Sequence, residues 1–372
     1  MNILALEPYY GGSHKAFLDG WMEKSRHSWK VLGLEPYKWK WRMRHSAVTF
    51  AGQVCDLSAD DFDVIFCSDM LNLAEFVGLL PLRWQRLPRV VYFHENQLTY
   101  PARFENERDY QFVFTNLTTA LAADSVWFNS AFHMDEFLSE MTNFLKRMPD
   151  YQPTEAVEKI RNKSTVCWPG VKSEIAAEKK TDSVLKILWV GRWEHDKKPE
   201  DFFEALKILK KKTDNFKINV IGEQFRDGPE VFDWAREYFA EHIERWGYQP
   251  TKEQYLQTLA ESDVVVSTAG HEFFGIAIVE AILAGALPVL PERLAYPEVM
   301  GLGVEKEAAE FFYDGSVISL AEKLIELVDK KAKGDLWALD DKKAIRLVEK
   351  FKWQSRTKVL DDEIDKLMQS RG

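Results

Sequence analysis

Apolar positions along the chain fall into two alternating patterns: short β-branched runs, and longer segments with helical spacing. The runs predict buried strands at 2–6, 64–67, 87–93, 126–130, 165–171, 184–190, 217–222, 263–268 and 287–290. The helical spacing predicts helices from 16 onward, at 110–123, from 131, and at 199–212, 230–245, 255–261, 275–284, 316–330 and 342–367. Nearly continuous apolar strands are typical of parallel sheets covered on both faces. The alternation predicts an α/β protein with two doubly wound Rossmann-like domains that face a cleft.

Length and composition set the domain organisation. A chain of 372 residues is long enough for two domains. The polar stretch 172–183 is the expected linker. We therefore expect an N-terminal domain at 1–175, a second domain at 184–350 and a final helical segment at 351–372, whereas no feature of the sequence sets the oligomeric state.

The lack of a recognisable targeting signal and the spacing of the cysteines favour a cytoplasmic protein. No apolar run reaches the roughly 18 residues of a membrane span, and the N-terminal run is interrupted too early for a signal peptide. Cys55, Cys67 and Cys167 have no metal-like spacing and suit a reducing compartment. The Asp61–Asp63 pair of an Asp-x-Asp sequence is expected to be a polar loop, so no metal site is predicted.

The stretch 271–291 combines a polar loop, a helix and a strand with two carboxylates, Glu272 and Glu280. A helix N-terminus carries about half a positive charge and attracts anions such as a diphosphate. Glu280 lies in an otherwise apolar helix and needs a polar partner, which the ribose of a nucleotide could supply. Glu272 would then face the sugar. Alternatively, Glu280 points to solvent and Glu272 is an ordinary acid of the first turn.

Two cations follow the predicted strand at 184–190. Arg192 and Lys197 flank the loop that leads to Pro199, a residue suited to the first position of a helix. A guanidinium fork and an ammonium point charge could together clamp a diphosphate. The alternative is that both are exposed surface cations.

In the first half of the chain, candidate functional residues come directly after two of the predicted strands. Gly11 and Gly12 come after the first strand and would let the backbone approach a phosphate, with Ser13 as a helix cap. An ordinary strand-to-helix turn is the alternative. His94 ends the strand at 87–93, at the sheet edge where open α/β folds bind ligands, and is the favoured functional residue there.

Residues 38–44 alternate between basic and apolar side chains. In a strand, this pattern would place Lys38, Lys40, Arg42 and Arg44 on one face. Residues 1–50 hold eight Lys and Arg against four Asp and Glu, a net charge of +4 in a chain whose total is −10. Cations interleaved with Trp39 and Trp41 suit a single-stranded RNA loop. A solvated strand edge with both tryptophans in the core is the other interpretation, and the two are compatible.

The spacing Glu-x7-Glu from Glu272 to Glu280, followed by Ala-x-x-Ala-Gly-x-x-Pro-Val, resembles the donor site of the family 4 GT-B glycosyltransferases. The N-terminal motifs narrow the resemblance to the tRNA-queuosine α-mannosyltransferases. They are Glu-Pro-Tyr-Tyr-Gly-Gly-Ser-His-Lys at 7–15, the stretch 38–47, Phe-His-Glu-Asn-Gln-Leu at 93–98 with Tyr100-Pro101, and Glu-Arg-Asp-Tyr-Gln at 107–111. The resemblance covers almost the whole chain.

This resemblance implies a retaining hexosyltransferase that moves mannose from GDP-mannose to queuosine in the anticodon loop of tRNA-Asp, without a metal or other cofactor. It also implies a role for each candidate residue. His94 would contact the transferred sugar, Glu272 its hydroxyls and Glu280 the ribose. The diphosphate would be held by Arg192, Lys197 and the N–H groups of Phe274 and Gly275, with Gly11 and Gly12 close by. The RNA face would comprise Lys38, Trp39, Lys40, Trp41, Arg42 and Arg44, and the C-terminal helix would pack on the N-terminal domain.

The net charge of −10 is unusual for a tRNA-binding enzyme, so two other functions stay open. One is a GT-B enzyme that uses another sugar nucleotide and a small-molecule or lipid acceptor, although no amphipathic basic helix is evident in the first half. The other is a non-catalytic RNA-binding relative. The presence of Arg192, Lys197, Glu272 and Glu280 together argues against a protein that has lost its activity.

Overall fold

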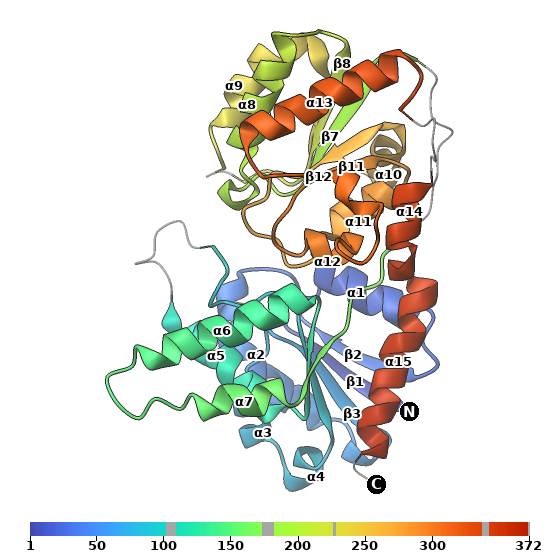
Figure 1. The fold of residues 1–372 in the computed structure, drawn as a ribbon. Helices are drawn as coiled ribbons and strands as arrows, with labels where there is room; N and C mark the ends of the chain where they lie inside the picture. The colour runs from blue at the N-terminus through green and yellow to red at the C-terminus, as the bar shows by residue number, and fades with distance from the viewer. Residues whose placement is uncertain (102–108, 173–181, 226–227, 337–341, 371–372) are drawn as a thin grey trace. The chain divides into compact units, whose positions relative to one another are not determined.

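A computed structural model describes residues 1–101, 109–172, 182–225, 228–336 and 342–370 of the chain. It divides into two compact units. Unit 1 comprises Met1–Gly170 together with Trp353–Gly372, and unit 2 comprises Val171–Lys352 (Figure 1). The predicted linker falls mostly outside the described residues.

Unit 1 is built on a parallel sheet whose six described strands run in the order β2-β1-β3-β4-β5-β6. Its strands are β1 (Asn2–Glu7), β2 (Ser28–Gly33), β3 (Val64–Ser68), β4 (Arg89–Phe93), β5 (Ser125–Phe128) and β6 (Ser164–Val166). Its helices are α1 (Gly12–Met22), α2 (Trp39–Val54), α3 (Leu73–Leu79), α4 (Leu82–Gln85), α5 (Tyr110–Ala122), α6 (Ala131–Lys146), α7 (Glu155–Arg161) and α15 (Trp353–Gln369). A short 3₁₀ turn, η1, spans Ala59–Asp61.

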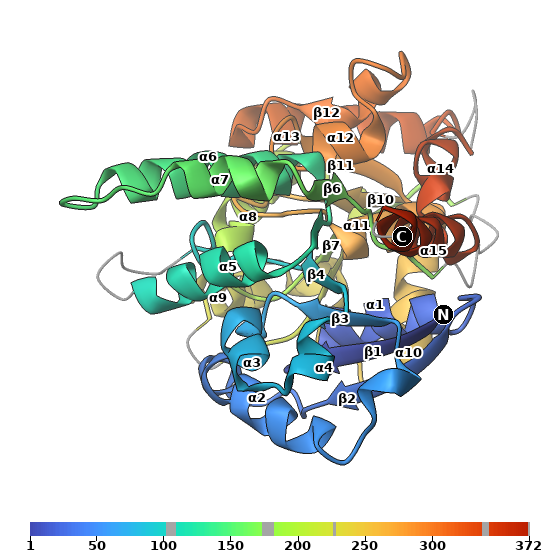
Figure 2. The same ribbon diagram turned by 90° about the horizontal axis from the view of Figure 1, so that it is seen from below.

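Alternate strand residues of unit 1 enter two separate cores. On one face, Ile3 and Val64 pack with side chains of α1 and α15. On the other face, Leu4 and Ile65 pack with side chains of α2, α3, α5, α6 and α7. Figure 2 shows these strands from below, with α1 and α2 beside them. The central strands β1, β3, β4 and β5 are therefore buried on both faces, as their apolar sequences predicted, whereas the edge strand β2 is partly exposed and was not predicted.

Unit 2 has a second parallel sheet, with described strands in the order β12-β11-β10-β7-β8-β9. They are β7 (Leu185–Val190), β8 (Phe216–Ile221), β9 (Ile243–Gly247), β10 (Val264–Val266), β11 (Leu287–Pro291) and β12 (Phe312–Tyr313). The helices are α8 (Pro199–Lys210), α9 (Val231–Tyr238), α10 (Lys252–Glu261), α11 (Ile276–Leu283), α12 (Tyr296–Met300), α13 (Val317–Ala332) and α14 (Lys343–Val348). The 3₁₀ turns are η3 (His195–Lys197), η4 (Ala240–His242), η5 (Ala308–Phe311) and η6 (Glu349–Phe351).

One predicted helix of unit 2 is wrong in its length. The helix expected at 230–245 ends at Tyr238, and residues Ile243–Gly247 form β9 at the edge of the sheet. The helical spacing lapses where Phe239 and His242 turn inward, and both are buried. An edge strand with polar Glu244 and Arg245 gives little apolar signal, which is why the sequence pattern missed it.

The last helix, α15, completes the core of unit 1. Trp353 is 3% exposed, and its indole lies against Gly20 of α1 and Gly170. A Cβ atom at either glycine would overlap the indole ring, so both positions require glycine for packing reasons. Figure 1 shows α15 running beside the unit 1 strands.

Asp361 fixes α15 by accepting hydrogen bonds from three donors. They are the Trp21 indole N–H (2.7 Å), the Ser25 hydroxyl (2.8 Å) and the Arg26 backbone N–H (2.9 Å). The Asp361 side chain is only 2% exposed. A buried carboxylate is tolerated because its lone pairs are occupied, and the donors in turn depend on it.

We predict that Asp361→Ala lowers the free energy of unfolding by about 3 kcal/mol, because it leaves buried donors without an acceptor. The matched control is Asp362→Ala on the same helix. Asp362 is 44% exposed and pairs with the Arg26 guanidinium at 2.8 Å, so its loss should cost less than about 1 kcal/mol. Urea unfolding followed by tryptophan fluorescence measures both. Equal effects of the two changes would contradict the assigned role of Asp361.

Candidate active site

In unit 2, the loop between β10 and α11 reverses direction at Gly275. This residue is the N-cap of α11 and has φ +90° and ψ +51°, a conformation that favours glycine. A Cβ atom there would also lie 3.0 Å from the Tyr296 ring. Gly275 is therefore required by both backbone and packing, and it fixes where the N–H groups of α11 begin.

Lys197, in η3, lies beside this loop. Its ammonium is 2.8 Å from the His271 carbonyl oxygen, 3.3 Å from Glu272 Oε2 and 3.1 Å from Asp196 Oδ2. Burial acts to lower the pKa of Lys197, but Glu272 and Asp196 outweigh it and raise the pKa above its usual value. The sequence interpretation of Lys197 as an exposed surface cation is wrong, since its side chain is only 15% exposed.

Glu272 is the partner of Lys197 and is likewise charged. Burial acts to raise the pKa of its carboxyl group, but Lys197 and the Phe274 backbone N–H outweigh burial and hold the pKa below its usual value. Phe274 itself is buried, with its ring edge-on to Phe351 at 5.0 Å. The structure thus brings Lys197, Glu272, Phe274 and Gly275 together at the start of α11.

Arg192 and Glu280 lie in different settings. The Arg192 guanidinium is 43% exposed and pairs with Glu194 at 3.2 Å, and its charge acts against that of Lys197. Glu280, within α11, accepts a hydrogen bond from the Tyr255 hydroxyl at 2.7 Å. The sequence required a polar partner for Glu280, and Tyr255 of α10 is one. The ribose role of Glu280 stays a prediction.

His271 was not singled out from the sequence. Burial and the nearby Lys197 lower its pKa to about 4, so the imidazole is neutral at pH 7. Its carbonyl oxygen accepts from Lys197, and its ring lies edge-on to Phe273 at 4.5 Å. A histidine immediately before Glu272 was the available signal, but sequence spacing alone did not show that Lys197 would reach it.

In unit 1, His94 follows β4 at the carboxyl edge of the sheet. Its backbone N–H donates to Asp69 Oδ1 (2.9 Å), and its carbonyl oxygen accepts from the Asn129 amide (2.8 Å). Its ring lies against His14 with centroids 4.0 Å apart and 32° between the ring planes. Burial and the positive charge of His14 hold the pKa of His94 well below its usual range.

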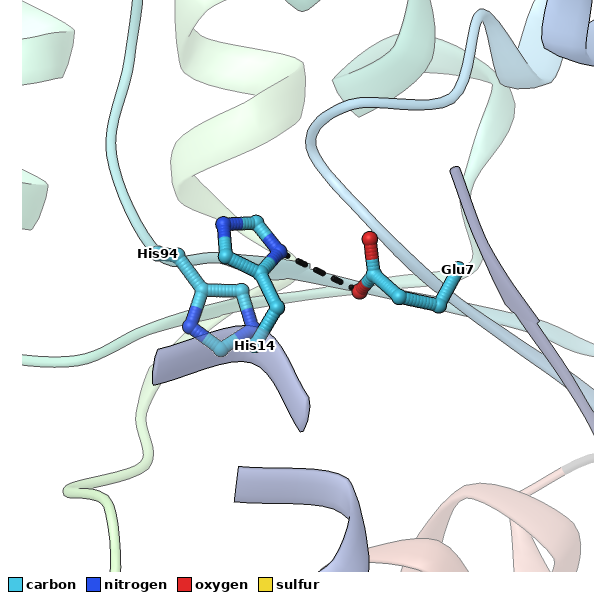
Figure 3. Close-up of side chains that lie close together, drawn as sticks. All are labelled: Glu7, His14 and His94. Atoms are coloured by element: carbon cyan, nitrogen blue, oxygen red, sulfur yellow. Dashed lines mark ion pairs between the residues drawn. The ribbon is translucent and has the colours of Figure 1, made fainter. Parts of the chain in front are cut away.

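The sequence analysis missed two residues beside His94: His14 of α1 and Glu7 at the end of β1. Their side chains form an ion pair, with 3.2 Å between His14 Nδ1 and Glu7 Oε2 (Figure 3). Burial lowers the pKa of His14, but Glu7 outweighs burial, and the pKa is raised to about 9. A glutamate that ends an apolar strand was the available signal, because it had to find a cation or a donor.

Gly11 and Gly12 differ in what requires glycine. A Cβ atom at Gly11 would overlap the Pro36 ring, whereas Gly12 has φ +51° and open space around it. The expected Ser13 cap is wrong, because α1 begins at Gly12 with Gly11 as its N-cap and without a side-chain cap. Packing against Pro36 alone requires glycine at position 11, and the role of Gly11 beside the phosphates stays a prediction.

The donor atoms of Glu7, His14 and His94 all lie within 4.8 Å of one another, close enough for the three side chains to share a metal ion. A zinc ion lies in the plane of each imidazole that binds it, about 2.0 Å from the nitrogen. Two rings stacked at 4.0 Å cannot both satisfy this condition without rotating. In the Asp-x-Asp sequence, Asp63 accepts from the Asn2 backbone N–H at 2.7 Å. The absence of a metal cofactor stays a prediction.

The predicted strand at 38–44 is wrong: Trp39–Val54 is the helix α2, with Lys38 as its N-cap. A helix has 3.6 residues per turn, so Lys40 and Arg44 share a face and Arg42 lies on another. Short alternation cannot outweigh the longer apolar spacing of Met43, Ala47 and Phe50, all buried.

The basic residues of α2 differ in their partners. Arg42 donates to the Glu35 carbonyl oxygen (2.9 Å), and Arg44 pairs with Asp109 at 2.9 Å. Trp39 and Trp41 are 38% and 61% exposed, so they are not the core residues of the alternative interpretation. The segment remains basic and aromatic at the surface, on a helix instead of a strand. Arg108, which directly precedes Asp109, lies outside the described residues.

Comparison with known proteins accounts for both halves of the chain. Residues 2–171 match the model of the tRNA-queuosine alpha-mannosyltransferase N-terminal family, and residues 171–342 match that of glycosyl transferases group 1. A tRNA-queuosine alpha-mannosyltransferase from Drosophila melanogaster is 37% identical over 310 residues, which cover 80% of this chain and 81% of the relative. The chain belongs to the tRNA-queuosine alpha-mannosyltransferase family.

Solved structures share the predicted fold of this family member. Anabaena HepE, in complex with UDP and glucose, superposes with a TM-score of 0.67 at 15% identity and covers 98% of this chain and 99% of its own. Sucrose-phosphate synthase from Thermosynechococcus elongatus gives 0.69 at 12% identity, with all of both chains covered. The predicted fold class and the hexosyltransferase class are thus confirmed. Among the described residues, no helix has the length and apolarity that crossing a membrane requires.

We predict that Gly275→Ala destabilises unit 2 by about 2 kcal/mol, because it adds both left-handed strain and a contact with Tyr296. The control is Gly303→Ala, at φ +87° with no atom within 4 Å of the new Cβ. That change carries only the backbone cost of about 1 kcal/mol. Thermal unfolding of the two variants separates the contributions, and an equal loss would show that the Tyr296 contact is unimportant.

Proposed function

We propose that this protein transfers mannose from GDP-mannose to the queuosine nucleoside in the anticodon loop of tRNA-Asp, in the cytoplasm and with retention of the anomeric configuration. The observation that carries the proposal is the Drosophila relative, whose similarity spans four fifths of both chains. The paired charges at the start of α11 and the basic, aromatic start of α2 support it with the chemistry it needs.

On the donor side, the start of α11 supplies groups suited to a nucleoside diphosphate. Lys197 provides a permanent positive charge, and its three acceptors hold the ammonium in place. Arg192 adds a second cation that is exposed enough to reach a ligand. The N–H groups of Phe274 and Gly275 add the positive end of the helix. In this proposal these groups stabilise the departing phosphate, while Glu280 binds the ribose.

On the sugar side, the proposed roles belong to Glu272 and His94. Glu272 is ionised and accepts hydrogen bonds from the sugar hydroxyls. His94 is neutral, so one ring nitrogen donates and the other accepts, which suits contact with the transferred sugar near its reactive carbon. Gly12 leaves open space beside the backbone for the phosphates. The transition state has oxocarbenium character, and we propose that no metal cofactor takes part.

On the acceptor side, the start of α2 is the proposed RNA face. Lys38 and Lys40 carry charge toward solvent beside Trp39 and the more exposed Trp41, whose ring can stack on an unpaired base. Arg42 and Arg44 keep intramolecular partners and would exchange or share them with RNA phosphates.

Radiolabelled mannose from GDP-mannose tests the proposal, with total tRNA from cells that make queuosine and from cells that cannot. We expect label only on queuosine-containing tRNA, including when EDTA is present. Labelling from another sugar nucleotide, or of a small molecule or lipid instead of tRNA, would overturn the donor or the acceptor. Lys197→Ala and Glu272→Ala should each abolish transfer without unfolding the protein, and full activity in either would contradict the donor site.

A second prediction concerns RNA binding. Replacing Lys40, Arg42 and Arg44 together by alanine should weaken tRNA binding and reduce the slope of log K against log salt by about 2, because up to three phosphate contacts are lost. Filter binding at several salt concentrations measures this slope.

The control removes the same charge elsewhere on unit 1, through Lys24→Ala, Lys30→Ala and Lys159→Ala, all at exposed positions. It should leave the slope nearly unchanged. If both triple variants bound tRNA like the parent at every salt concentration, the RNA face would lie elsewhere.

A further inference from the structure

We propose that Glu7 is a positioning residue of the transfer reaction: its carboxylate holds the His14 ring in place beside His94, so that His14 presents a positive charge to a phosphate of the substrate. The inference rests on the proposed function and adds two residues, Glu7 and His14, to the site. It stands on the arrangement of three side chains from β1, α1 and the loop after β4.

The Glu7 carboxylate is positioned at both oxygens. Oε1 accepts from the Tyr9 backbone N–H (2.9 Å) and from the Ser68 hydroxyl (2.9 Å), while Oε2 lies 3.2 Å from His14 Nδ1. The side chain is 1% exposed, so it cannot exchange these partners for water. A buried carboxylate held in this way is a fixed counter-ion, not a surface charge that happens to be close.

His14 has a reason to need this counter-ion. It lies in the first turn of α1, where the helix dipole disfavours a cation. It is also largely buried, which disfavours charge further. Glu7 overcomes both effects. In Figure 3, one ring nitrogen of His14 faces Glu7, and the other ring nitrogen points away from Glu7. That nitrogen can carry an N–H toward a ligand.

The contact between the His14 and His94 rings allows only one of the two imidazoles to be protonated. The rings are stacked at 4.0 Å, and two like charges at this distance would repel strongly. His14 takes the charge because Glu7 faces it, and His94 stays neutral because it is buried and because it faces His14 and, from α6, His133. Asp69, after β3, and Glu95, after β4, also face His14 and favour its charge, and burial raises the pKa of Asp69 itself to about 8. The site therefore contains one cation and one neutral imidazole in fixed places.

A phosphate is the ligand that fits this arrangement. The His14 side chain shares the first turn of α1 with backbone N–H groups, and the N-cap Gly11 supplies no side chain to occupy them. An imidazolium N–H and a helix N-terminus together favour an anion. The donor diphosphate and a tRNA backbone phosphate share this chemistry, and kinetics distinguish them.

The test compares Glu7→Gln with the parent in the mannose-transfer assay from pH 5.5 to 9.5. The amide keeps the hydrogen bonds of Oε1 and removes the charge. In the parent, His14 stays protonated until about pH 9, so kcat/KM should fall only above that pH. Without Glu7, burial and the helix dipole act on His14 with less to oppose them, so its pKa should fall to its ordinary value of about 6.5 or below. The variant should then be at least about 30-fold less active than the parent at pH 8, and the difference should shrink as the pH falls toward 5.5.

Two further variants separate charge from structure. Glu7→Asp keeps the charge and should restore part of the activity at pH 8. Ser68→Ala removes a neutral partner of Glu7, so its alkaline limit should stay near that of the parent. Loss of activity in Glu7→Gln by the same factor at every pH would overturn the proposal, because it would indicate a purely structural role. A rise in KM for GDP-mannose would assign the phosphate to the donor, and a rise in KM for tRNA would assign it to the acceptor.

The inference can fail independently of the proposed function. If the parent transferred no mannose, the function would be wrong, but NMR titration of the histidine ring protons would still test the pair. His14, assigned by its absence in His14→Gln, should titrate near pH 9 in the parent and at or below about 6.5 in Glu7→Gln. A midpoint near 6.5 in the parent would overturn the role of Glu7.

Discussion

Burial of carboxylates is the constraint on which both units depend. Each buried acid must be matched by donors or cations, and each match joins segments distant in the sequence. Asp361 joins α15 to the end of α1, 336 residues away in the bond with Ser25. In unit 2, Asp263 accepts from the Lys186 backbone N–H (2.9 Å) and from the Lys331 ammonium (2.9 Å). These hydrogen bonds join β7 and α13 to the residue that precedes β10.

The same constraint produces the chemistry of both candidate sites. Glu272 and Lys197 hold each other charged in unit 2, whereas Glu7 and His14 do so in unit 1. Neighbouring imidazoles then have to be neutral, as His271 and His94 are. A parallel sheet places these groups at the carboxyl ends of its strands, where backbone hydrogen bonding stops and ligands can bind.

Sequence patterns were sufficient where one physical signal dominated. β-Branched runs gave the buried strands, and the apolar helix after Gly275 gave the candidate donor site with its correct start. Sequence patterns were insufficient where a segment was polar or where its pattern fitted both a strand and a helix. The edge strand β9 is polar, and the start of α2 alternates like a strand for about two turns before its helical spacing appears. Pairings such as Tyr255 with Glu280, or Glu7 with His14, depend on tertiary contacts that spacing does not encode.

Residues 38–44 lie at the start of a helix and not in the predicted strand, which alters how the proposed RNA face would work. A strand would have offered a row of cations at regular spacing along one phosphate backbone. A helix instead separates Lys40 and Arg44 from Arg42 and leaves Trp41, 61% exposed, among them. Arg44 is already neutralised by Asp109, and its guanidinium lies over the Phe112 ring at 4.5 Å. In the proposed RNA face, binding through this helix would depend more on stacking and less on charge than the sequence suggests, which suits a looped, unpaired target in a chain with a net charge of −10.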